Sequence, residues 1–163
     1  MKSVYKQIAV FIMISFSFSF PVNAEMSTGS IAQAEGFKNA GQFFRANRVY
    51  FMALRKDAND TSAHYGLADS YYRNQQIDKA LESINKLLAI NSLNVEALLL
   101  QGQLFLTKQM WQQALNAFQL VRDVGPSKAE IYLGLREAYT GLDDKGSAKQ
   151  MQVIYDSLVT AGR

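Results

Sequence analysis

The sequence predicts an all-α solenoid of about four antiparallel helix pairs, because the chain repeats itself with a period of 34 residues. The period is visible in a column of alanines and in a column of aromatic residues nine positions upstream of them. The alanines are Ala46, Ala80, Ala114 and Ala148, and the aromatic residues are Phe37, Tyr71, Phe105 and Tyr139. Two columns in register at this spacing are typical of stacked copies of one small unit.

Two further columns flank the alanines and stay apolar until the last copy. Three residues before each alanine stand Phe43, Ile77, Trp111 and Lys145, and four residues after it stand Tyr50, Ile84, Phe118 and Gln152. A terminal repeat has no neighbour that covers it, so polar residues in these columns are expected in the last copy.

Residues 61–94 give the clearest copy of the unit. Apolar residues recur at helical spacing in two segments, from Leu67 to Tyr72 and from Ala80 to Leu88, and the polar turn 73–76 separates them. Two helices joined by so short a turn run antiparallel, and we expect the alanine where the second helix lies closest to the first. The aromatic column then fills the space between units, where each ring buries about 150–250 Å².

The pattern resembles the tetratricopeptide repeat family, whose unit has a small residue in its first helix, an aromatic residue in its second and a proline near its end. The residues that match these positions are Ala68, Gly102, Tyr50, Phe118 and Pro126. The resemblance covers residues 25–163 and implies units at about 27–60, 61–94, 95–128 and 129–162. It also implies that the units wind into a right-handed superhelix.

Departures from the resembled unit are found in the first and last copies. Ser30 and Gln33 replace apolar residues, which predicts a weak and partly frayed first helix. Arg136 stands where a small residue is expected, so the last two helices should pack less closely. We expect the last helix, 147–159, to cap the stack itself. The alternative is self-association through this edge, which would give a homo-oligomer.

Residues 1–24 have the pattern of a cleavable secretory signal peptide. Lys2 and Lys6 precede an apolar run from Ile8 to Phe20, and an A-x-A-like site ends at Ala24. A membrane anchor is the alternative, but a helix of this run would be about 20 Å long, which is short for a bilayer core of roughly 30 Å. The chain has no cysteine that could carry a lipid. We therefore expect a soluble periplasmic protein of a Gram-negative bacterium and not a lipoprotein.

Charge and composition exclude several classes of function. Without the two leader lysines the chain has 15 basic and 14 acidic residues and no basic run, so nucleic acid is not expected as a partner. With no cysteine and one histidine, His64, we expect no metal site, no catalytic residues, no cofactor and no small-molecule substrate. His64 should pack between helices. The protein is predicted not to be an enzyme.

The resemblance implies that function lies on the concave face of the stack, which first-helix positions line. These positions hold Tyr65, Asp69, Tyr72, Arg73, Leu99, Leu100, Gln103, Leu106, Leu133 and Glu137. Tyrosines and leucines on a rigid concave face suit an extended or helical peptide with apolar anchors. The alternative is that several of these residues belong to the core between helices.

Charges on this face indicate what kind of peptide it prefers. Family members that bind a C-terminal carboxylate use lysine, asparagine and arginine at positions that here hold Ile31, Glu35, Gly66, Glu96 and Leu100, so no carboxylate clamp is expected. Acidic residues outnumber Lys38 and Arg73 on the face, which predicts a preference for a neutral or basic peptide. The acidic residues are Glu35, Asp69, Glu96, Glu130 and Glu137.

Three functional classes are compatible with an exported protein of this kind. The first is an assembly scaffold for pilus or secretion machinery, such as the Tad/Flp pilus, in which similar small exported repeat proteins occur. The second is a periplasmic chaperone of an exported client. The third is an accessory subunit of an envelope enzyme system such as cytochrome maturation.

Overall fold

The computed structural model describes residues 30–125 and 128–161, and within these ranges it has eight α-helices and no strand. The helices are α1 (Ile31–Asn39), α2 (Phe43–Lys56), α3 (Thr61–Arg73), α4 (Ile77–Ile90), α5 (Val95–Thr107), α6 (Trp111–Val124), α7 (Ala129–Gly141) and α8 (Lys145–Ala161). The predicted all-α solenoid of four helix pairs is confirmed. The proposed leader and Pro126 lie outside the described residues.

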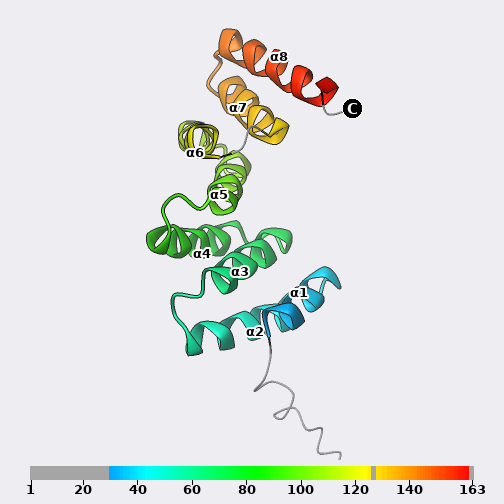
Figure 1. The fold of residues 1–163 in the computed structure, drawn as a ribbon, viewed down its shortest axis with the longest axis vertical. Coiled ribbons are helices and arrows are strands. Elements are labelled where there is room, and N and C mark those ends of the chain that lie inside the picture. The colour runs from blue at the N-terminus through cyan, green and yellow to red at the C-terminus, as the bar shows by residue number, and fades with distance from the viewer. Residues whose placement is uncertain (1–29, 126–127, 162–163) are drawn as a thin grey trace, which may run out of the picture.

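The helices stack as antiparallel pairs along the long axis of the molecule, with α1 and α2 at one end and α7 and α8 at the other (Figure 1). Each helix packs against the next one in the chain. Contacts between helices two apart are found, among the described helices, only for the first helices α1, α3, α5 and α7. The first helices therefore lie closer to one another than the second helices do, and they form the inner layer.

The period recurs in the backbone at the turn inside each unit. Gly41, Gln75, Gln109 and Asp143 have positive φ angles of 72°, 58°, 56° and 59°, and they are spaced 34 residues apart. A left-handed residue at this point is a common way to end one helix and start a connection. Only one of the four is glycine, so the repeat of this geometry was not visible in composition.

Side-chain caps fix where the first helices begin. Asp60 and Asn94 accept hydrogen bonds from the backbone N–H groups of Ala63 and Ala97, at 3.0 and 2.9 Å. Ser30 does the same for α1, accepting from the Gln33 N–H at 3.3 Å. At this position Ser30 caps the helix, so a polar residue there does not by itself weaken α1. The helix it caps is the shortest of the eight, with nine residues.

The large side chain at the centre of each interface is matched to small residues on the helices that face it. Phe118 is 1% exposed, and a Cβ added to Gly102 or Gly134 would lie 2.7 or 2.4 Å from its Cζ atom. Tyr50 occupies the same repeat position in the first unit, two units before Phe118, and a Cβ added to Gly66 would lie 2.3 Å from its Cε1 atom. Where the column holds the smaller Ile84, the position equivalent to Gly66 and Gly134 is a leucine, Leu100.

The last unit replaces this apolar match with a polar pair. Arg136 donates a hydrogen bond to the side-chain oxygen of Gln152, and these two residues occupy the positions of Gly102 and Phe118 in the preceding unit. Ala148 is half-buried, whereas the other three column alanines are fully buried. The expectation that the last two helices pack less closely was wrong, because α7 and α8 contact each other more extensively than any other two described helices. Helix α8 extends two residues beyond the predicted 147–159 at each end.

No helix in the described ranges is long and apolar enough to span a bilayer.

Candidate peptide-binding groove

Ion pairs fill the inner layer at the N-terminal end of the stack. Lys38 Nζ lies 2.7 Å from a carboxylate oxygen of Glu35 and 2.7 Å from one of Asp69, and the lysine side chain is only 4% exposed. Arg73 Nε completes the network at 3.1 Å from Asp69. The Tyr50 hydroxyl donates a hydrogen bond to the second oxygen of Glu35. These charges are neutralised between α1 and α3 and leave little room for a ligand.

The surroundings of Tyr50 and Tyr65 favour the neutral form of both hydroxyls. Burial is the main cause that raises the pKa of the Tyr50 hydroxyl, and its hydrogen bond to Glu35 and the charges of Glu35 and Asp69 raise it further. Burial, followed by the charges of Asp69 and Glu96, also raises the pKa of Tyr65. The Tyr50 hydroxyl therefore keeps the proton that it donates to Glu35, and both rings pack against the core.

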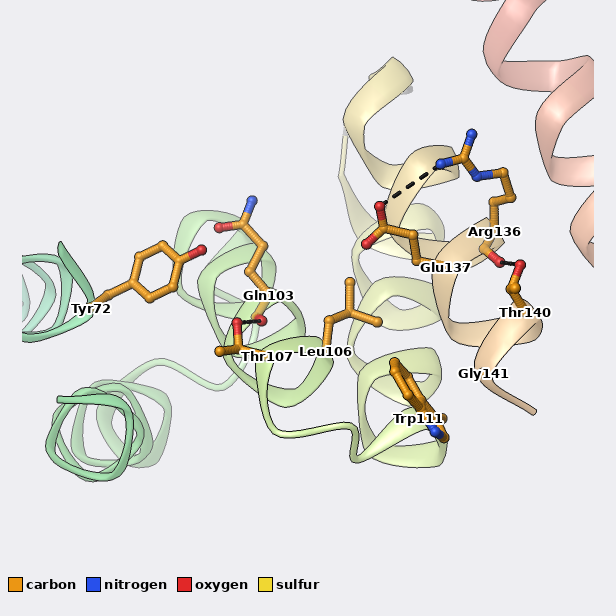
Figure 2. Close-up of a pocket in the computed structure, with 9 residues that line it drawn as sticks. All are labelled: Tyr72, Gln103, Leu106, Thr107, Trp111, Arg136, Glu137, Thr140 and Gly141. Carbon is orange, nitrogen blue, oxygen red and sulfur yellow. Dashed lines mark hydrogen bonds and ion pairs between the residues drawn. The ribbon is translucent and has the colours of Figure 1, made fainter. Parts of the chain in front are cut away.

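The inner layer is open farther along, where α3, α5 and α7 surround a pocket of about 830 Å³ (Figure 2). Tyr72 reaches in from α3, and Leu106 from α5 faces α7 across the pocket. Trp111, the first residue of α6, closes the pocket at its base. All lining residues are Tyr72, Gln103, Leu106, Thr107, Trp111, Arg136, Glu137, Thr140 and Gly141.

Packing against a glycine positions the Trp111 ring at the base of this pocket. A Cβ added to Gly141 would lie 2.2 Å from Cδ2 of the indole, so only glycine allows α7 to approach the ring this closely. Trp111 and Leu106 are both half-buried. The remaining exposed part of each apolar side chain faces the pocket, where a ligand could cover it.

Polar groups surround the apolar base, and most of them are already paired within the protein. Arg136 lies 3.8 Å from Glu137, so the two charges of the pocket are of opposite sign and close together. The hydroxyls of Thr107 and Thr140 donate to backbone carbonyls one turn earlier in their own helices. Gln103 is exposed and keeps its amide available. The pocket is therefore nearly neutral, with one amide to orient a ligand.

Four of the ten residues predicted to line the concave face lie together in this pocket, namely Tyr72, Gln103, Leu106 and Glu137. Asp69 and Arg73 pair in the ion network instead. Tyr65 and Leu99 are half-buried against the core, and Leu133 is also half-buried. Leu100 belongs to the core and is 5% exposed, so its placement on the groove was wrong, because the match to Ile84 takes its side chain inward.

The expected acidic excess of the face is also reduced by the structure. Pairing of Glu35 and Asp69 with Lys38 and Arg73 does not change the count, but two further basic residues do. Arg136 lies 3.8 Å from Glu137, and Lys128 lies 3.8 Å from Glu130. The preference for a neutral peptide stays a prediction. The excess of acid that favoured a basic one is smaller than the residue count indicated.

Sequence reasoning missed five residues of the pocket, Thr107, Trp111, Arg136, Thr140 and Gly141. Trp111 was assigned to an apolar column of the core, and Arg136 was noted only as a departure from the repeat. The repeat gave no signal for the pair of Trp111 and Gly141, because Trp111 begins the second helix of one unit and Gly141 ends the first helix of the next.

The other candidate for chemistry, His64, is in the core. It is 6% exposed and its Nε2 atom lies 3.0 Å from the carbonyl oxygen of Ala58, so it packs between helices as predicted. Within residues 30–125 and 128–161, no three histidine, aspartate or glutamate side chains are grouped so that they could hold a metal ion.

Comparisons with known proteins agree with this architecture. MamA (residues 41 to the end) of Desulfovibrio magneticus RS-1 superimposes with a TM-score of 0.74 at 19% identity, over 80% of this chain and 74% of that one. A tetratricopeptide repeat protein of Parabacteroides merdae gives 0.72 at 20% identity, over 78% and 50%. The second such domain of human RPAP3, in complex with the HSP70 peptide SGPTIEEVD, gives 0.64 at 16% identity, over 70% and 95%.

Sequence comparison identifies the repeat itself. No curated protein matches the chain. The tetratricopeptide repeat profile matches residues 31–95 and 65–129, which together make up more than half of the sequence. These matches, the 34-residue recurrence of turns and the four stacked helix pairs show that the chain belongs to the tetratricopeptide repeat family.

Proposed function

We propose that this protein is a non-enzymatic scaffold that binds a peptide segment of a partner protein in the pocket between α3, α5 and α7. The observation that carries the proposal is the half-buried apolar base that Leu106, on the inner helix α5, forms with Trp111 at the start of α6. Inner faces of such solenoids are their usual recognition surfaces. The RPAP3 domains, which share this fold, are described with bound peptides, and that supports the same mode of binding here.

The pocket chemistry favours a neutral segment with one or two apolar anchors. Its charges, Arg136 and Glu137, already oppose each other, whereas the ring of Trp111 and the side chain of Leu106 have uncovered area. An aromatic or aliphatic side chain would cover that area, and the Gln103 amide could pair with the peptide backbone. The RPAP3 peptides SRMEEVD and SGPTIEEVD are acidic, so we expect different partners for this chain.

The place of action we propose is the bacterial periplasm, with pilus or secretion machinery as the assembly served. Support comes from the leader-like residues 1–24. Affinity capture from an envelope extract tests this part. Recovery of pilus or secretion components, lost with the variant described next, is expected, and recovery of cytoplasmic proteins alone would contradict it.

Replacing Tyr72 and Leu106 together with alanine is expected to weaken peptide binding by on the order of 100-fold, because both side chains supply the apolar contact area of the pocket. The probe is a peptide selected against the wild-type protein from a random displayed library, and its affinity is measured by fluorescence anisotropy. Leu120→Ala removes an exposed leucine of α6 outside the pocket and is the matched control.

Circular dichroism of the three proteins shows whether they remain equally folded. The groove assignment fails if Leu120→Ala weakens the peptide as much as the double variant does. It also fails if the folded double variant binds like the wild type.

A further inference from the structure

The outer face of α2 differs from the outer faces of the other second helices. Positions 44, 48, 51 and 55 are spaced so that they form one stripe along a helix. In α2 this stripe holds Phe44, Arg48, Phe51 and Arg55, all exposed, with Phe44 at 76% and Phe51 at 47%. Exposed phenylalanines at this level are unusual because each leaves a large apolar surface in water.

The repeat itself supplies the comparison. One period later, the same four positions of α4 hold Asp78, Glu82, Asn85 and Ala89, and those of α6 hold Gln112, Asn116, Gln119 and Asp123. In α8 they hold Gly146, Gln150, Val153 and Ser157. The other second helices therefore have no aromatic and no basic residue at the positions where α2 alternates phenylalanine and arginine. Stacking does not require this alternation, because equivalent helices stack without it.

Charge separates α2 from every other helix that the structure describes. Its sequence FFRANRVYFMALRK contains four basic residues and no acidic one, whereas each of the other seven helices contains at least one acidic residue. Neither Arg48 nor Arg55 forms an ion pair with a described residue. The formal net charge of the whole chain is only +3, so a positive potential at α2 is a local property.

We propose that the outer face of α2 binds the surface of an anionic membrane. Phenylalanines next to basic residues on one helix face are the combination that interfacial helices use: the rings enter the headgroup region and the cations meet lipid phosphates. A protein partner fits less well. A stable protein interface takes about 800 Å² and 20–30 residues per partner, whereas the combination of phenylalanine and arginine is confined to α2 and is not continued at the equivalent positions of α4.

The position of α2 in the fold suits this role. It lies at one end of the stack, on the outer layer, whereas the proposed peptide pocket lies on the inner layer between α3, α5 and α7 (Figures 1 and 2). Membrane and peptide could therefore be bound at the same time. The two proposals rest on different residues and are tested separately.

Vesicle sedimentation tests the membrane proposal, with the protein purified after export and its N-terminus read by mass spectrometry. The vesicles contain phosphatidylcholine alone, or phosphatidylcholine with about a third of phosphatidylglycerol to supply a negative surface potential. We expect binding to the anionic vesicles only, and weaker binding at high salt because exposed charges are screened. Equal binding to neutral vesicles, or none to anionic ones, would overturn the proposal.

Substitutions in α2 and α8 test which part of the chain binds the anionic vesicles. Arg48→Gln with Arg55→Gln should weaken binding to anionic vesicles about 25-fold, since each basic residue near such a surface contributes about fivefold. Phe44→Ala with Phe51→Ala should weaken it on the order of tenfold or more. Lys145→Gln with Lys149→Gln removes the same charge from exposed lysines of α8 at the opposite end and should leave binding within about twofold.

The control decides between a local and a general effect. If the α8 variant loses as much binding as the Arg48 and Arg55 variant, the attraction follows total charge and the α2 assignment is wrong. Peptide affinity of the α2 variants should be unchanged, so a failure here leaves the pocket proposal standing.

Discussion

Gly134→Leu is expected to lower the free energy of unfolding by on the order of 3 kcal/mol, the largest effect of any single substitution considered for this chain. A Cβ at this position would lie 2.4 Å from the Cζ atom of Phe118, which is buried between α5, α6 and α7. The ring has little room to move, because Gly102 of α5 approaches it as well, and a Cβ added there would lie 2.7 Å from the same Cζ atom. Urea unfolding followed by circular dichroism measures the change.

A triple variant tests whether the clash with Phe118 is the reason that leucine at position 134 destabilises the protein. Phe118→Ile with Gly102→Ala and Gly134→Leu recreates the combination of Ile84, Ala68 and Leu100 found in the interface one unit earlier. We expect the triple variant to recover more than about half of the stability lost by Gly134→Leu alone. If the triple variant is no more stable than the single one, size matching at this interface is not the cause.

Lys38→Met is expected to cost about 2 kcal/mol of unfolding free energy. The substitution keeps the length of the side chain but leaves Glu35 and Asp69 without the ammonium that lies 2.7 Å from both. Removing one partner of a buried pair typically costs 3–5 kcal/mol. The lower value is expected here because Arg73 still pairs with Asp69, and Glu35 is 40% exposed.

Neutral partners provide the control for this prediction. Adding Glu35→Gln and Asp69→Asn to Lys38→Met removes the uncompensated charges while it retains most hydrogen bonds, so most of the lost stability should return. Urea unfolding of both variants at neutral pH measures this. A triple variant as unstable as Lys38→Met would show that packing of the lysine stem, and not its charge, holds α1 on α3.

Much of the fold could be predicted from the spacing of a few residues. The alanine and aromatic columns set the helix pairs, and the predicted turn at 73–76 differs by one residue from the connection 74–76 between α3 and α4. The columns could not show the match between Phe118 and Gly134, because the two residues occupy different positions of successive units. Only the packing of one helix pair on the next brings them together.

The candidate site was predicted in part. Tyr72, Gln103, Leu106 and Glu137 were assigned from their positions in the repeat, and they line one pocket. Asp69 was assigned to the same face, but it pairs with Lys38, and that pairing depends on side-chain reach between α1 and α3, which the repeat does not encode. Trp111 was missed because it shares a repeat position with Phe43 and Ile77, and residues at one repeat position can pack in the core of one unit and face a pocket in another.

Fluorescence of Trp111 tests the central claim most directly, because it is the one tryptophan of the chain and forms the base of the pocket. The titrant is a selected peptide that contains no tryptophan. If the peptide binds between α3, α5 and α7, the emission shifts to shorter wavelength as the indole loses water, and the shift saturates at the affinity measured by anisotropy. Saturable binding by anisotropy with unchanged Trp111 emission would place the peptide elsewhere and contradict the account.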